Sequence, residues 1–136
     1  MEWQDCLLDR DVPGEELAAA LAEFLEIAPA DILIVDELSE DITENIQLIC
    51  HRIPARGEFC LLLCPYPRSQ AAKDADCTQA VRYLSRKLRC RCLIPDEQLN
   101  PYSWLLLDNG EGPQPAFLET EGLDREPEEY RLKREP

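Results

Sequence analysis

Residues 59–64, with the sequence Phe-Cys-Leu-Leu-Leu-Cys, form an apolar run without a polar break. Gly57 precedes the run and Pro65 follows it. A continuous apolar run of this length, bounded by turn-forming residues, predicts a strand that is buried on both faces. We therefore expect the rest of the chain to be arranged around this strand.

Two further segments have the spacing of amphipathic helices. The first helix is expected to begin near Pro13, which suits a first turn, with Asp11 as its N-cap, and to end near Ile27 or Ala28, before Pro29. The second is expected over residues 70–89. The apolar stripe of the first helix consists of Leu17, Leu21, Phe24, Leu25 and Ala28, and that of the second consists of Cys77, Val81, Leu84 and Leu88.

The remaining apolar segments are too short for helices and predict strands. A strand over 46–53 and the strand over 59–64 are joined by a short turn at Pro54–Gly57, so we expect them to pair in antiparallel fashion. Residues 108–113 contain two glycines and a proline and predict a turn. The other expected strands cover residues 5–9, 32–35, 90–94, 102–107 and 117–118.

These elements together predict an α+β fold. We expect one domain over residues 1–125, with a mixed or mostly antiparallel sheet of about six to eight strands and both helices packed on one of its faces. The unit from 59 to 94 has the order of a right-handed parallel crossover. Residues 126–136 are highly charged and predict an edge strand or a frayed tail.

The chain contains seven cysteines, an odd number, and most of them lie inside apolar runs. This pattern favours reduced thiols that serve as small core residues over a framework of disulfides. No apolar run approaches the length that crosses a bilayer, and the acidic N-terminus lacks the features of a signal peptide. We therefore expect a cytoplasmic protein.

The net charge of −14 is unevenly distributed along the chain. Residues 1–44 contain fourteen acidic residues and one basic residue, residues 45–91 carry a net charge of +6, and residues 92–136 carry −7. Such a field attracts basic partners and repels phosphate backbones and anionic membranes. Arg82, Arg86 and Arg89 form a basic stripe on the second helix, which we interpret as a solvated face or as a contact with acidic residues of this chain or of a second copy.

Candidate catalytic and metal-binding groups are few. His51 is the single histidine, which excludes sites that need two imidazoles, and as a polar strand residue it is expected to be structural. No C-x-x-C knuckle, calcium-binding loop, phosphate-binding loop or nucleophile elbow is present. Cys92, beside Arg91, is the best candidate for a reactive thiol, although a buried structural thiol is the expected role. We accordingly predict no cofactor, no metal and no enzymatic activity.

The acidic first third of the chain is the main functional signal. We predict that it binds a basic protein partner, with Trp3, Tyr102 or Trp104 as possible anchors. The predicted partner-binding residues are Glu23, Glu26, Asp36, Glu37, Glu40, Asp41 and Glu44.

In size, acidity and lack of catalytic motifs the chain resembles the small immunity proteins of bacterial polymorphic and contact-dependent toxin systems. The resemblance implies that the acidic surface blocks a toxin, often a nuclease with a basic cleft. Two other functions stay open: a dimeric chaperone-like factor of a secretion system, and a small enzyme or ligand-binding domain that uses a thiol or carboxylates.

Overall fold

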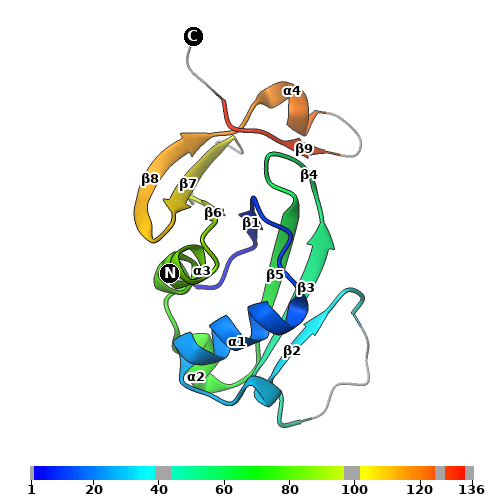
Figure 1. The fold of residues 1–136 in the computed structure, drawn as a ribbon, viewed down its shortest axis with the longest axis vertical. Coiled ribbons are helices and arrows are strands. Elements are labelled where there is room, and N and C mark those ends of the chain that lie inside the picture. The colour runs from blue at the N-terminus through cyan, green and yellow to red at the C-terminus, as the bar shows by residue number, and fades with distance from the viewer. Residues whose placement is uncertain (1, 39–43, 97–101, 125–127, 134–136) are drawn as a thin grey trace.

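The computed structural model describes residues 2–38, 44–96, 102–124 and 128–133. Its main element is a seven-stranded mixed sheet, and the two long helices, α1 and α3, pack side by side on one face of it (Figure 1). The fold class predicted from the sequence is therefore confirmed as α+β. Among the described residues, no helix has the length and apolar character needed to cross a membrane.

The order of strands in the sheet is β2-β3-β5-β1-β6-β7-β8. Only the β2–β3 pair is parallel, and every other pair is antiparallel. A separate two-stranded parallel sheet joins β4 to β9. The strands are β1 Cys6–Leu8, β2 Ile32–Val35, β3 Leu48–Pro54, β4 Arg56–Gly57, β5 Leu61–Pro67, β6 Arg91–Pro95, β7 Ser103–Asp108, β8 Glu111–Phe117 and β9 Glu129–Tyr130.

The middle of the sheet is occupied by β1, a strand of only three residues, all buried. The apolar run around which the chain was expected to be arranged forms most of β5, which lies one place away, between β3 and β1. Because β5 and β6 are both antiparallel to β1, they run parallel to each other with β1 between them. The expected crossover from 59 to 94 therefore connects two parallel strands that are not direct neighbours.

Strand β5 continues through Pro65 and Pro67, where the sequence predicted that it would end. The two prolines are opposite Cys50 and Leu48 of β3. Being two residues apart, they share one side of the strand, and the missing N–H groups would point toward β1. Since β1 pairs only with residues 61–63 of β5, no neighbouring strand needs those donors.

The helical face holds the larger core. Leu17 and Leu21 of α1 (Gly14–Leu25) and Val81 and Leu84 of α3 (Cys77–Lys87) pack on the sheet, as their spacing predicted. The single helix expected over 70–89 is instead divided into α2 (Gln70–Asp74) and α3. The division falls at Asp76, whose side chain caps α3 by accepting a hydrogen bond from the main-chain N–H of Gln79 at 3.0 Å.

The opposite face of the sheet is only partly covered. A second core cluster, centred on Phe59, Leu7 and Leu93, lies over the β1–β6–β7 half of this face. It is closed by residues 118–124, which include α4 (Thr120–Leu123), and by residues 128–133, which include β9. Leu118 and Leu132 form an isolated β-bridge, and the main-chain N–H of Phe59 donates to the main-chain oxygen of Tyr130 at 3.2 Å. The β2–β3–β5 half of this face has no such cover among the described residues.

Candidate interaction surface

The uncovered half of the sheet presents a row of mostly apolar side chains, which we call the open face. The side chains of residues paired across two strands point to the same side of a sheet, so the strand register identifies the residues of the open face. They form the groups Leu33–Ile49–Tyr66, Val35–His51–Cys64 and Ile53–Leu62. The side chains of β3 and β5 that alternate with them, including Leu48, Cys50, Leu61 and Leu63, point into the helical core.

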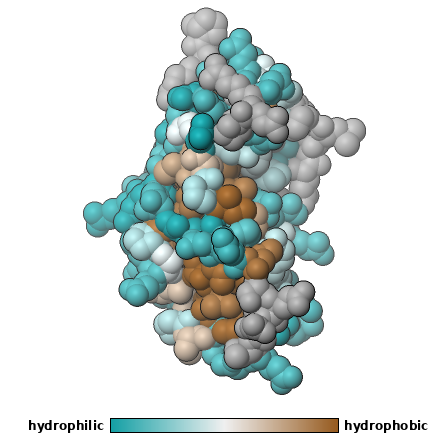
Figure 2. Space-filling view, turned by 90° about the vertical axis from the view of Figure 1, so that its right-hand side faces the viewer, coloured by the Kyte–Doolittle hydropathy of each residue, from teal (hydrophilic) through white to brown (hydrophobic). Residues whose placement is uncertain are grey.

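Several residues of the open face are accessible to solvent. Tyr66 is 44% exposed, which is high for a large aromatic residue, and Leu33, Val35, Ile53 and Leu62 are half-buried. Figure 2 shows apolar side chains gathered down the middle of one side of the molecule, with hydrophilic side chains around and between them. Ile53 and Leu62 also line a hollow between β3–β5 and the C-terminal segment, to which Tyr130 contributes. An exposed apolar surface with a polar border is typical of a protein-binding site.

Three of the predicted acidic residues lie beside this face. Asp36 and Glu37 directly follow β2, Glu44 lies shortly before β3, and all three are exposed. We call these three residues the acidic rim. The predicted residues Glu40 and Asp41 lie outside the described residues. Because β2 and β3 are parallel, Asp36 and Glu37 lie at one end of this edge pair of strands and Glu44 lies toward the other end.

The other two predicted residues, Glu23 and Glu26, belong to a different surface. They lie at the C-terminal end of α1, which covers the helical face of the sheet. The carboxylate of Glu23 pairs with Lys87 of α3 at 3.1 Å. Hydrogen bonds from Tyr83 and Lys87 lower the pKa of Glu23, so this carboxylate already has cationic and hydroxyl partners within the chain. The predicted acidic residues therefore do not form one continuous site.

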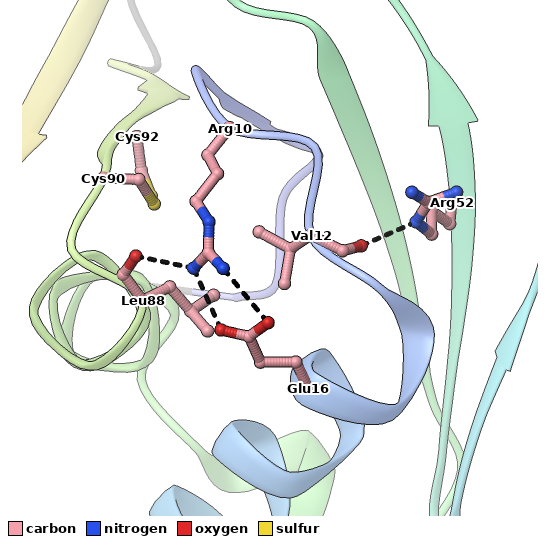
Figure 3. Close-up of polar contacts among 7 residues, drawn as sticks. All are labelled: Arg10, Val12, Glu16, Arg52, Leu88, Cys90 and Cys92. Atoms are coloured by element: carbon pink, nitrogen blue, oxygen red, sulfur yellow. Dashed lines mark hydrogen bonds and ion pairs between the residues drawn. The ribbon is translucent and has the colours of Figure 1, made fainter.

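Asp36 is held in place by two adjacent residues of β3. Arg52, whose side chain is 18% exposed, contacts the carboxylates of both Asp36, at 3.5 Å, and Asp11. Its Nε donates to the main-chain oxygen of Val12 at 2.8 Å, as Figure 3 shows. His51 Nε2 lies 2.9 Å from the main-chain oxygen of Asp36. Asp11 therefore interacts with Arg52 and does not cap α1, whose N-cap residue is Pro13.

A second arginine fixes the start of α1 to the end of α3. The guanidinium of Arg10 makes two hydrogen bonds to the Glu16 carboxylate, at 2.9 and 3.1 Å, and one to the Leu88 oxygen at 2.9 Å (Figure 3). The thiols of Cys90 and Cys92 lie nearby in the same view, 3.8 Å apart. These contacts connect the two helices that form one side of the core, so they act on the fold and not on the open face.

The thiols show no sign of chemical activation. All seven cysteines are free, and all except Cys60 are buried. The hydrogen bond with Cys90, followed by burial, raises the pKa of Cys92, and burial raises the pKa of Cys50 to about 12. An activated thiol has a lowered pKa. Among the described residues, no three histidine, cysteine or acidic side chains are grouped closely enough to hold a metal.

Two residues of the basic stripe, Arg82 and Arg86, lie on α3 and make contacts within the chain, whereas Arg89 lies beyond the C-cap of α3. Arg82 donates to the main-chain oxygen of Gly112, the Arg86 guanidinium lies 5.7 Å from the centre of the Tyr83 ring, and Lys87 pairs with Glu23. Arg82 and Arg86 of the stripe thus contact a main-chain oxygen and an aromatic ring, and the contact with an acidic residue is made by Lys87, which lies beside the stripe.

The sequence did not reveal the open face. Both faces of β3 and β5 are rich in apolar residues, so alternation alone could not say which one is covered. The expected anchors also lie elsewhere. Trp3 packs against the helical core and donates to the Ala72 oxygen at 2.6 Å, whereas Trp104 packs on the second cluster.

Comparisons with other proteins give no relative from which a function can be inferred. No family matches the chain, and no curated protein or solved structure matches it significantly. Any functional conclusion therefore depends on the surface itself.

Proposed function

We propose that this protein is a binding protein that neutralises a basic protein partner, in the manner of the small immunity proteins of bacterial toxin systems. The proposed binding surface is the open face together with the acidic rim. Binding is proposed to occur in the cytoplasm, where the seven free thiols would stay reduced. The activity consists of recognition and requires no bond-making step.

The observation that carries this proposal is the position of Asp36 and Glu37 directly after β2, at the border of the partly exposed apolar side chains of β2, β3 and β5. Apolar and aromatic residues such as Tyr66 and Leu62 supply the buried centre of an interface, and charged residues around them guide the partner. Carboxylates at the border increase the rate at which a basic partner associates. This combination favours a basic protein over a nucleic acid or an anionic membrane.

The two alternative functions have less support. A dimeric chaperone-like factor would bury the open face against a second copy, which would bring two chains with a charge of −14 each into contact. A thiol enzyme would need an activated cysteine, whereas burial and neighbouring thiols raise the pKa values of Cys50 and Cys92. Neither a homodimer nor a thiol enzyme would use the acidic rim.

The test begins with affinity capture of partners from the source cell, followed by kinetic measurements on the captured partner. We expect the double substitution Asp36→Lys and Glu37→Lys to lower the association rate constant at low salt at least fivefold. The control is Glu23→Lys with Glu26→Lys, which makes the same change in net charge on the helical face and is expected to alter this rate less than twofold. A partner that is acidic, or one that is slowed only by the control substitutions, would contradict the proposal.

A further inference from the structure

We propose that the outer edge of β2 receives an extended basic segment of the partner as an added eighth strand of the sheet. This inference rests on the proposed function and specifies how the partner docks. Added strands bind through main-chain hydrogen bonds, and their side chains provide the specificity. Four structural features support this assignment to β2.

The first feature is the difference between the two edges of the seven-stranded sheet. At one edge, β8 carries Pro113 and Pro115, which lack N–H donors. Prolines on an edge strand prevent another chain from pairing with it. The opposite edge strand, β2, has the sequence Ile-Leu-Ile-Val and contains no proline, glycine or charged residue. One edge is thus protected and the other is suited to pairing.

The second feature is the direction of the main-chain groups of β2. Pro65 and Pro67 of β5 are paired with Cys50 and Leu48 of β3. Because a proline has no N–H to donate, these are the non-hydrogen-bonded pairs of the antiparallel ladder. The main-chain N–H and C=O groups of Cys50 and Leu48 therefore point away from β5 and toward β2. In the parallel pair this makes Leu33 and Val35 the residues of β2 that face β3. The N–H and C=O of Ile34 consequently point away from the sheet, and among the described residues no strand lies on that side.

The third feature is the charge around this edge. Asp31 lies at the beginning of β2, and Asp36 and Glu37 lie at its end. The first turn of α1 adds Glu15, next to Gly14, where a Cβ would lie 3.4 Å from the Ile34 side chain. An added strand would therefore have acidic residues at both of its ends and the acidic first turn of α1 near its middle, which favours lysine and arginine side chains in the segment that binds.

The fourth feature is that the same charges disfavour a second copy of this chain. Two β2 strands paired in antiparallel fashion about their centres would place Asp31 of one copy opposite Asp36 of the other, at both ends of the pair. Like charges directly opposite each other destabilise strand pairing. The occupant to which the structure points is thus a basic segment of a different protein.

The experiment uses the full chain and a capped octapeptide of four Lys-Val repeats as the probe, with four Glu-Val repeats as the control peptide. The test variant is Ile34→Pro, which removes the outward N–H, and its matched control is Ile34→Ala, which removes most of the same side chain but keeps the N–H. We expect the Lys-Val peptide to bind, the Glu-Val peptide not to bind, and Ile34→Pro to raise the dissociation constant at least tenfold relative to Ile34→Ala.

Amide hydrogen exchange of the unsubstituted chain supplies a second measurement that does not depend on the stability of the proline variant. Saturating Lys-Val peptide is expected to slow exchange at Ile34 at least tenfold and to leave Leu63, inside the sheet, unchanged. Equal binding by the two Ile34 variants together with unchanged exchange at Ile34 would overturn the proposal. Dimerisation of the free chain that Ile34→Pro abolishes would overturn it in favour of a second copy.

The captured partner separates failure of this inference from failure of the proposed function. If the partner binds Ile34→Pro and Ile34→Ala equally but is slowed by substitution of Asp36 and Glu37, the acidic rim binds a basic partner without strand addition. If neither substitution affects the partner, both the inference and the proposed binding surface are wrong.

Discussion

The His51 imidazole is bound to the main chain of Asp36, with 2.9 Å between Nε2 and the carbonyl oxygen, and this contact joins the open face to the acidic rim. The adjacent residue, Arg52, contacts the Asp36 carboxylate from the other side of the strand. Two neighbouring residues of β3 thus hold one acidic residue by its backbone and by its side chain. A rim fixed in this way loses little conformational freedom when a partner binds.

The contacts of Arg52 lead to a prediction about stability. Arg52→Lys keeps the positive charge but removes the Nε–H that donates to the Val12 oxygen, and Val12 is fully buried. We expect the free energy of unfolding to fall by about 1 kcal/mol, the typical net value of such a hydrogen bond. Urea unfolding measures the change. Asp11→Asn is the control: its carboxylate is 74% exposed, and a change of less than about 0.5 kcal/mol is expected.

A pair of glycines provides a second prediction. Gly57 has φ of +99°, and a Cβ at this position would lie 2.6 Å from the main-chain oxygen of Tyr130. We expect Gly57→Ala to destabilise the protein by about 3 kcal/mol, because the strain and the clash with a backbone atom cannot be relieved by a side-chain movement. Gly14→Ala, where Cβ meets only the Ile34 side chain at 3.4 Å, is expected to stabilise by about 0.5 kcal/mol. Equal effects of the two substitutions in thermal unfolding would contradict this explanation.

The buried thiols predict a loss of stability at high pH. Burial raises the pKa of Cys50 to about 12 and that of Cys64 to about 11, whereas an unfolded thiol ionises near about 8.5. The folded-state pKa is the higher one, so the unfolded chain loses its thiol protons first. The stability that each neutral buried thiol contributes is therefore fully present below about pH 8.5 and is lost as the pH rises toward 11–12. Each such thiol should lower the free energy of unfolding by about 1.4 kcal/mol per pH unit in this window.

Urea unfolding between pH 8 and 10.5 checks this dependence. Cys50→Ala should make the fall of the free energy of unfolding with pH less steep by the contribution of one thiol. At pH 7 the same substitution should show only the effect of the lost packing. A slope that is the same in the variant and in the original chain would show that Cys50 is not the group responsible.

The C-terminal segment gives a fourth prediction. Ending the chain at Asp124 removes the acceptor of the Phe59 N–H and the partner of Leu118, and it exposes the second core cluster. We expect a loss of about 3 kcal/mol or more, comparable to the removal of a large buried side chain. Arg131→Ala in the full chain is the control, since its exposed pair with Glu129 should contribute less than about 0.5 kcal/mol. A truncated chain as stable as the full one would show that the segment does not stabilise the cluster.

The parts of the fold that depend on local patterns were predictable from the sequence. Leu17 and Leu21 lie where the helical spacing placed them, and the antiparallel pairing of β3 with β5 follows from the short turn between them. The bounds were less accurate at Pro65 and at Pro113. Both prolines were interpreted as parts of turns, but each lies in a strand where no neighbour requires its N–H, and that depends on the position of the strand in the sheet.

The parts that depend on contacts distant in sequence were not predictable. Nothing in Cys6–Leu8 shows that these residues occupy the middle of the sheet, because the partners Leu63 and Leu93 are far along the chain. The candidate site has the same limitation. The sequence identified Asp36 and Glu37 from charge alone. The open face becomes visible only in the structure, where residues 118–124 and 128–133 cover one half of the sheet and none of the described residues covers the other half in the same way.

The central place of β1 also affects how the molecule can assemble during synthesis. Its two neighbours are β5 and β6, and β6 ends at Pro95, so β1 cannot be paired on both sides until roughly the first hundred residues have left the ribosome. Until then the apolar residues of β1 and β5 are accessible to other chains, and closing such distant pairs is slow. The protein should therefore acquire its native form late in translation, in one step that joins its earliest strand to its later ones.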